Sequence, residues 1–301
     1  MMLPNFIILV KLYRLFRTSH STDLKGENRK LVTTEGPNTN NNYINSTAFI
    51  PTVNRLVYIY SEAYNKPFFL KTCNLDGSDK KTIKTFPAGT NVGLVKATSD
   101  GKIFYTLPGN SYPNQTPSKT FSMKADGTEE VEIKVPLYAS ISDPDLVSAD
   151  GNGILSTNGY FGVIVNGIFD ELKSFNVLLN EVKDQTLISD LSLSNDATKL
   201  TFAQKTGIAG QYEIRIKNVV KDAPTSTVLY TLNIPSDASE YSLSLHFVNG
   251  TKNILVSYGK FTFPKGSAND YTQCELLDAA TGKVTQTWKF MGDEIYNPTT
   301  N

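Results

Sequence analysis

The sequence predicts an all-β protein, a β-propeller of about five four-stranded antiparallel blades. Three observations lead to this prediction. Two sets of tight-turn motifs alternate along the chain, short strand-forming runs follow the turns, and no long segment has a helical hydrophobic period. Aromatic residues, which favour strands, make up 11% of the chain. A six-bladed ring is the alternative if the N-terminal segment contributes strands.

The first set of turns combines a small acidic or amide residue with, in most cases, glycine. Such pairs supply the positive φ that tight hairpins need. The members recur at intervals of roughly fifty residues, the length of a propeller repeat. They are Asn54-Arg55, Asp100-Gly101, Asn158-Gly159, Asp196-Ala197 and Asn249-Gly250.

In the third repeat, Asp150-Gly151 is a second choice for the turn of the first set. We assign Asn158-Gly159 because the strand-like run 161–165 follows it at the expected distance. Residues 143–153 then form an enlarged loop.

The second set of turns follows the first at a nearly constant interval of roughly 25 residues. Each repeat therefore reads as strand, tight turn, strand, longer loop, strand, tight turn, strand. One such sheet cannot bury both of its faces alone, so the sheets are expected to stack around an axis. The members are Asp76-Gly77, Asp126-Gly127, Asp184, Asp222-Ala223 and Asp278.

The repeat resembles that of the TolB-type propellers, relatives of the WD-repeat propellers that occur in bacterial periplasmic and secreted proteins. The resemblance covers about residues 45–291, although the family's Trp-containing inner strand is mostly missing. It implies a propeller fold and specifies no chemistry. The matching segments are Ser99-Asp100-Gly101-Lys102-Ile103-Phe104-Tyr105, Asn74-Leu75-Asp76-Gly77-Ser78, Lys124-Ala125-Asp126-Gly127-Thr128 and Ser194-Asn195-Asp196-Ala197-Thr198-Lys199-Leu200.

Residues 1–44 are set apart as an apolar and basic segment followed by a polar linker, and residues 45–301 as the propeller domain. The apolar stretch 3–16 is too short to span a bilayer, which takes about 20 residues. Its basic residues follow the apolar run, whereas those of a good export signal precede it. A degenerate export signal, a short amphipathic helix and a strand added to the propeller all remain open. The chain could also be a fragment of a larger propeller or fusion protein.

Composition excludes several functions. Lys plus Arg and Asp plus Glu both number 29, so no net charge attracts nucleic acid. Cys73 and Cys274 occupy similar places in different repeats, too far apart for a disulfide. With His20 and His246 as the only histidines, and without a G-x-S-x-G motif, neither a metal site nor a serine hydrolase is expected. We expect no cofactor, and a monomer.

Five residues are the candidates for ligand binding. His246 lies in an alternating strand and would approach the central channel if that strand is innermost; the alternative is an ordinary hydrogen-bonded strand histidine. Asp143 and Asp145 lie in the enlarged loop, and Tyr112 and Phe263 lie in other long loops. The long loops are 107–118, 139–153 and 261–270.

These features predict a non-enzymatic binding or scaffolding propeller outside the cytoplasm. It would recognise a protein, peptide or glycan through loops at one rim, with polar contacts and aromatic anchors. The alternative is a glycan hydrolase or lyase centred on the channel. That function would need two or three carboxylates that converge there.

Overall fold

The computed structural model describes residues 8–12, 18–22, 30–34, 43–63, 65–90, 92–93, 95–109, 116, 118–135, 147–148, 150–156, 159–165, 168–178, 181, 188–248, 251–260, 269–291 and 295–300. These residues form strands, turns and bends, and none of them is helical. Within these ranges, therefore, no helix is long and apolar enough to cross a membrane.

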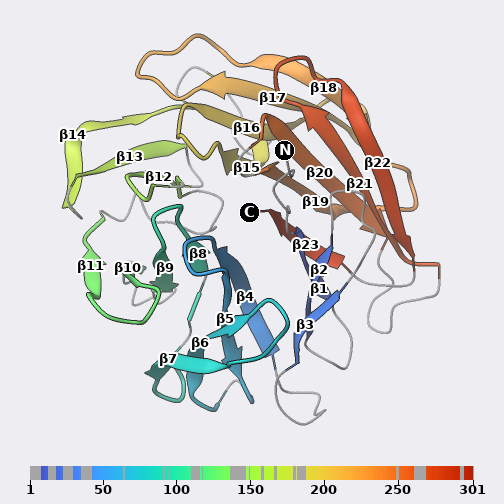
Figure 1. The fold of residues 1–301 in the computed structure, drawn as a ribbon. Helices are drawn as coiled ribbons and strands as arrows, with labels where there is room; N and C mark the ends of the chain where they lie inside the picture. Colours follow the sequence, from blue (N-terminus) through green and yellow to red (C-terminus); the bar gives the residue numbers. More distant parts are fainter. Residues whose placement is uncertain are drawn as a thin grey trace, which may run out of the picture.

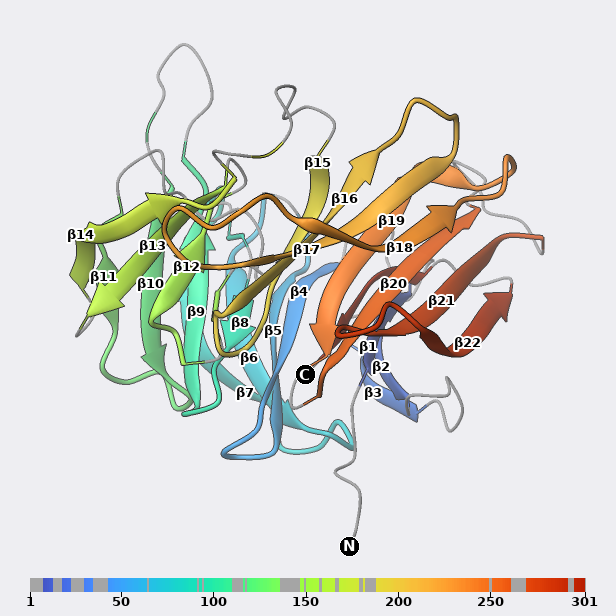
Figure 2. The same ribbon diagram turned by 90° about the horizontal axis from the view of Figure 1, so that it is seen from above.

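The strands form six antiparallel sheets that surround a central axis, which confirms the predicted β-propeller (Figure 1). Five sheets have four strands, and one has three. Viewed from the side, the sheets stand next to one another as blades (Figure 2).

Five of the sheets are built from strands that are consecutive in the chain. The β4–β7 sheet comprises β4 (Tyr43–Ile50), β5 (Arg55–Ser61), β6 (Phe68–Asn74) and β7 (Lys81–Phe86). The next two comprise β8 (Val95–Ala97), β9 (Lys102–Leu107), β10 (Lys119–Lys124) and β11 (Val131–Ile133), then β12 (Gly153–Leu155), β13 (Tyr160–Val165) and β14 (Ile168–Asn176). The last two comprise β15 (Ile188–Leu193), β16 (Lys199–Lys205), β17 (Gln211–Asn218) and β18 (Thr227–Asn233), then β19 (Ser239–Val248), β20 (Asn253–Lys260), β21 (Tyr271–Asp278) and β22 (Val284–Met291).

The remaining sheet joins the two ends of the chain. It comprises β23 (Ile295–Thr300), β1 (Ile8–Leu12), β2 (Thr18–Thr22) and β3 (Lys30–Thr34), in that order. The pairing of Ile8 with Thr300 and of Leu12 with Ile295 closes the ring. The strands β1, β2 and β3 lie within residues 1–44, which the sequence analysis set apart from the propeller. A six-bladed ring was the expected alternative if this N-terminal segment contributed strands.

The sheet of three strands is extended by a single bridge. Val147 pairs with Ile154 of β12, at the place where the neighbouring sheets have a full innermost strand. In the turn between the two, the Ser148 hydroxyl donates to Asp150 Oδ1 at 2.6 Å. The turn therefore connects a very short first strand to the second strand of the blade.

The corresponding turn of the next sheet has the same geometry. The Ser194 hydroxyl donates to Asp196 Oδ1 at 2.7 Å, and in both turns the serine oxygen accepts a backbone N–H from five residues later at 2.8 Å. The turn of the third repeat is therefore Asp150-Gly151, and the assignment to Asn158-Gly159 was wrong. The Asp-Gly and Asn-Gly motifs could not distinguish these two turns, because Gly151 and Gly159 both adopt the positive φ that such motifs predict. Gly159 lies in the connection from β12 to β13.

The other described turns of the two sets join the first to the second strand, or the third to the fourth, as predicted. Asp184 was expected between a third and a fourth strand, but it follows β14, the last strand of its blade, and precedes β15 of the next. Asp76 Oδ1 accepts the Ser78 backbone N–H at 2.9 Å, and Asp126 accepts that of Thr128 at the same distance. The Ser78 and Thr128 hydroxyls also donate to these carboxylates, each at 2.6 Å. These side-chain hydrogen bonds, and next the backbone ones, hold the pKa of both aspartates below their usual range. Asp184, Asn158 and Asn249-Gly250 lie outside the described residues.

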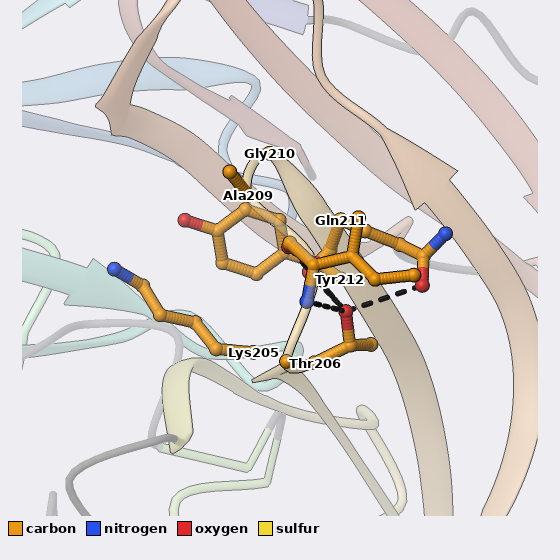
Figure 3. Close-up of a pocket in the computed structure, with 8 residues that line it drawn as sticks. Lys205, Thr206, Ala209, Gly210, Gln211 and Tyr212 are labelled. Carbon is orange, nitrogen blue, oxygen red and sulfur yellow. Dashed lines mark hydrogen bonds between the residues drawn. The ribbon is translucent and has the colours of Figure 1, made fainter.

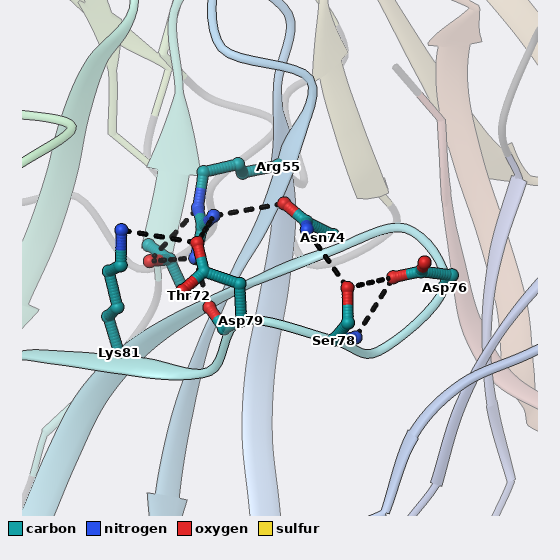
Figure 4. Close-up of polar contacts among 7 residues, drawn as sticks. All are labelled: Arg55, Thr72, Asn74, Asp76, Ser78, Asp79 and Lys81. Carbon is teal, nitrogen blue, oxygen red and sulfur yellow. Dashed lines mark hydrogen bonds and ion pairs between the residues drawn. The ribbon is translucent and has the colours of Figure 1, made fainter.

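Arg55 ties together the two turns of the β4–β7 sheet (Figure 4). Its guanidinium donates to Asn74 Oδ1 at 3.0 Å and forms an ion pair of 2.7 Å with Asp79. Lys81 contacts the same Asp79 carboxylate at 3.1 Å. The start of the second strand is thereby fixed to the turn between the third and fourth strands.

The hydrophobic core lies between adjacent sheets. The second strands β5, β9, β16 and β20 are buried on both faces, whereas the outermost strand β22 alternates between half-buried and exposed residues. Each fully buried side chain, such as Ile59 or Phe202, contributes about 1.5–3 kcal/mol relative to an exposed position. Neighbouring blades therefore stabilise one another.

Cys73 and Cys274 lie on β6 and β21, the third strands of different sheets. Both are buried and neither forms a disulfide bond, as predicted. Burial, and next the charge of Glu275, raise the pKa of the Cys274 thiol. This thiol is therefore a core residue rather than a nucleophile.

Candidate functional site

The strand order places the connections of the blades at two opposite rims. In an antiparallel sheet, the turns from first to second and from third to fourth strand lie at one end, here called the turn rim. The connections from second to third strand, and from one sheet to the next, lie at the other end, the loop rim. The predicted long loops 107–118 and 261–270, and the part of 139–153 that precedes Val147, all join strand ends at the loop rim.

Four of the five predicted ligand-binding residues lie outside the described residues. They are Tyr112, Asp143, Asp145 and Phe263. Their proposed roles therefore stay predictions. His246 is the one that the structure describes.

His246 lies on β19, the innermost strand of its sheet, and it is only 5% exposed. Its Nε2 is 2.7 Å from the Ser244 hydroxyl oxygen. Burial, and next the charge of Lys96, lower its pKa to about 3, so the imidazole is neutral at physiological pH. Lys96 lies on β8, the innermost strand of the sheet across the ring (Figure 1). The geometry is that of a buried, hydrogen-bonded strand histidine.

The described side chains of the innermost strands do not bring carboxylates together. Asp190 is the one carboxylate among the described side chains of β4, β8, β15 and β19. Apart from Lys96 and His246, the other described side chains of these strands are mostly Ser, Thr and apolar residues. A glycosidase needs a pair of carboxylates about 5–9.5 Å apart. These side chains provide no such pair.

A polar cluster runs from the loop rim into the interface between the β15–β18 and β19–β22 sheets, where Glu275 lies opposite Val256 in the middle of its strand. Tyr258, near the end of β20, donates its hydroxyl hydrogen to Glu275 Oε1 at 3.1 Å. Tyr271, the first residue of β21, donates to Asp237 Oδ1 at 3.1 Å. Tyr230 of β18 lies near the same Glu275 carboxylate. These five residues are called the tyrosine–carboxylate cluster below.

Glu275 is the most deeply placed carboxylate of the cluster. The residue is 8% exposed, and its Oε2 atom has no hydrogen-bond partner although it is buried. Burial, and next the nearby Glu275 carboxylate, raise the pKa of Tyr230 to about 12 and also raise that of Tyr258. Both hydroxyls therefore keep their protons and act as donors at neutral pH.

Two lysines border the cluster. The Lys260 ammonium is 3.6 Å from Asp237 Oδ2. The Lys289 ammonium lies 3.7 Å from the centre of the Tyr271 ring, a cation–π contact. Asp237 and Tyr271 thus already have cationic neighbours. No ion pair joins Glu275 to a lysine or arginine of the described chain.

A separate hollow of about 290 Å³ lies on the loop rim (Figure 3). It is formed by the connection from β16 to β17, in which Ile208 is 62% exposed. The Ile234 N–H donates to the Gly210 carbonyl at 2.8 Å, which fixes this connection to the segment that carries Asp237. The lining residues are Lys205, Thr206, Gly207, Ile208, Ala209, Gly210, Gln211 and Tyr212.

Sequence analysis identified the 261–270 loop but missed the residues that flank it. Tyr258 and Tyr271 lie just outside the loop, and in the sequence they are ordinary members of the strand-forming runs on either side of it. Glu275 follows the alternation of an ordinary strand, so no motif distinguishes it. An acidic residue on the third strand, where its neighbours are buried, is the one signal that could have indicated it.

No family model and no curated protein matches this sequence. Among solved structures, the putative TolB from Agrobacterium tumefaciens is 11% identical, with a TM-score of 0.52 over 98% of this chain and 92% of that chain. The tricorn protease is 15% identical, with a TM-score of 0.53 over 98% of this chain and 27% of that one. An oligogalacturonate lyase from Vibrio parahaemolyticus is 12% identical, with a TM-score of 0.51 over 82% and 72%.

At these identities the likeness shows the fold alone. It confirms the propeller architecture and the resemblance to TolB-type propellers that the repeat predicted.

Proposed function

We propose that this propeller is a non-enzymatic binding or scaffolding protein that recognises a protein, peptide or glycan through its loop rim. The observation that carries the proposal is the hollow of the β16–β17 connection on the loop rim, with the rim end of the tyrosine–carboxylate cluster on the segment bonded to that connection. Tyrosine provides a large contact area with a polar tip at small entropic cost, which suits binding surfaces.

A hydrolase or lyase is less well supported. The two carboxylates of the cluster, Asp237 and Glu275, accept hydrogen bonds from tyrosines. The described innermost strands supply no converging pair, and the similarity to the oligogalacturonate lyase is one of fold.

The rim proposal is tested with a glycan array and a displayed peptide library, probed with the full chain. Ile208→Asp places a charge in the hollow and is expected to abolish binding of the selected ligand. Val53→Asp is the matched control, since Val53 is also exposed, at 47%, but lies in the turn from β4 to β5 on the opposite rim. Equal loss in both variants, or no ligand in either screen, contradicts the proposal.

The proposed location is outside the cytoplasm, and its support is the resemblance of the repeat. Ile8–Leu12 lies between β23 and β2 in the sheet that closes the ring. Cleavage of an export signal after this run would therefore remove a strand. Cell fractionation combined with mass spectrometry of the mature N-terminus tests the location, and a cytoplasmic protein would contradict it.

A further inference from the structure

The strand β22 forms the outer edge of its sheet, on the outside of the ring (Figures 1 and 2). It pairs with β21 on one side, and no described strand pairs with its other side. The pairing with β21 runs without a break from Gln286 to Met291. Every second residue of such a run directs both its N–H and its C=O group outward. Over about 20 Å, β22 therefore offers main-chain hydrogen-bond partners to another strand.

The outermost strands of the other sheets are interrupted or short. Register shifts break the pairing of β3, β7, β14 and β18, and β11 has only three residues. The longest unbroken run among them is Tyr230–Asn233 of β18. Bulges and short strands are devices by which proteins prevent pairing at sheet edges. The one register shift of β22 lies before Gln286, so the rest of this strand lacks such a device.

The side chains of β22 do not block its edge either. Val284–Met291 contains no proline and no acidic residue, and its one charged residue is Lys289. A lysine that protects an edge projects beyond it. The Lys289 ammonium instead lies 3.7 Å from the centre of the Tyr271 ring on β21, so this side chain turns back over the sheet. No carboxylate of the described residues forms an ion pair with it, and its charge remains available to a partner.

We infer that the outer edge of β22 is a docking site for an extended acidic segment of a partner protein. The segment adds to the sheet as an antiparallel strand, with main-chain hydrogen bonds for affinity and a carboxylate opposite Lys289 for specificity. A basic segment would place like charges opposite each other, which is destabilising. This edge does not include the hollow of the loop rim, so the inference does not rest on the proposed function.

The test uses two peptides on the full chain, acetyl-Thr-Val-Glu-Val-Thr-Val-amide and the same peptide with Lys in place of Glu. Fluorescence anisotropy of labelled peptides measures their affinities. Trp288 is the only tryptophan of the chain and lies half-buried on β22, so its emission during titration with unlabelled peptide reports binding at this strand. We expect the Glu peptide to shift this emission and to bind about five-fold more tightly than the Lys peptide.

Two N-methylated forms of the Glu peptide test the main-chain pairing. One carries N-methyl groups on its odd residues and the other on its even residues, so each lacks the N–H groups of one edge. We expect one form to lose about ten-fold or more in affinity, because its N–H groups would face β22. The other form should bind like the unmodified peptide and serves as the control.

Lys289→Glu tests the charge and should reverse the preference in favour of the Lys peptide. The matched control is Lys81→Glu, at an exposed lysine on β7, the outermost strand of another sheet; it should keep the preference for the Glu peptide. Near-UV circular dichroism should show a native spectrum for both variants. If Lys289→Glu does not fold, Lys289→Gln serves instead, and the two peptides should bind to it equally.

Several outcomes overturn the inference: neither peptide binds, both bind equally to the wild type, Lys289→Glu keeps the Glu preference, or the two N-methylated forms bind alike. Binding without a change in Trp288 emission would place the peptide elsewhere and overturn it as well. Ile208→Asp should leave the peptide affinity unchanged. Loss of peptide binding in that variant would end this inference while supporting the loop rim, so the two proposals fail separately.

Discussion

Lys217 and Glu181 form a buried ion pair between a strand of the β15–β18 sheet and the connection that leads into that sheet. The Lys217 ammonium donates to Glu181 Oε1 at 2.6 Å, and the two side chains are 2% and 3% exposed. Lys217 lies on β17, whereas Glu181 lies between β14 and β15. The Ser226 N–H and hydroxyl also donate to the carboxylate. Burial opposes ionisation, but these hydrogen bonds outweigh it and hold the pKa of Glu181 below its usual range.

Glu181→Gln should lower the free energy of unfolding by about 3 kcal/mol, because it leaves the Lys217 charge buried without a counter-ion. Urea denaturation at pH 7 measures the change. Glu129→Gln is the control, since Glu129 pairs with Lys124 at an exposed site, where ion pairs contribute little. A loss in Glu181→Gln no larger than in the control would mean that the pair does not hold the connection to the sheet.

Gly282 lies at a close approach between the β15–β18 and β19–β22 sheets. Its φ is +70°, and a Cβ there would lie 1.8 Å from the Leu229 carbonyl oxygen of β18. Gly89 also has a positive φ, of +80°, but nothing lies within 4 Å of its added Cβ. Gly89→Ala should therefore cost about 1–2 kcal/mol from the backbone alone. Gly282→Ala should cost about 1–3 kcal/mol more. Thermal melts of both variants give the difference, and equal losses would refute the close contact.

The buried His246 should make stability depend on pH. Its pKa is about 3 in the folded protein, and the unfolded chain binds a proton near pH 6.5, so acid favours unfolding. The stabilisation is complete above pH 6.5 and is lost as the pH falls below it, by about 2 kcal/mol between pH 7 and pH 5. His246→Asn should remove that part of the dependence, as followed by urea denaturation at several pH values. His20→Asn, which leaves His246 in place, should retain it.

The strand β1 should be required for closure of the ring. Deletion of residues 1–12 removes its pairing with both β2 and β23, and we expect the melting temperature to fall by at least about 5 °C. Deletion of residues 1–7 leaves every strand in place and serves as the control. Identical melts for the two truncations would show that β1 does not hold the ring together.

The fold was predictable because the repeat depends on local turn chemistry. Asp76 and Asp126 accept the same backbone N–H two residues later, so their motifs are visible in sequence. The sequence did not decide whether the N-terminal segment forms strands, because Ile8–Leu12 pairs with a strand from the other end of the chain. The hydrophobicity of this run alone does not distinguish a paired strand from an export signal or a helix.

The candidate site was much less predictable. His246 was singled out for its rarity, yet it is a buried residue that bonds to Ser244. Glu275 and Tyr230 come together only because two sheets pack face to face. Such a contact between distant strands leaves no spacing pattern in the sequence, whereas the loop between Lys260 and Tyr271 could be found from its composition.

The sheet that joins both chain ends also sets the order of events during synthesis. β1 leaves the ribosome early, but the strand that flanks it, β23, is made after all five other sheets. Until then one edge of β1 has no neighbour and could pair with another nascent chain. The ring can therefore shut only after translation has passed residue 300, and chaperones that shield open strand edges should matter most in that interval.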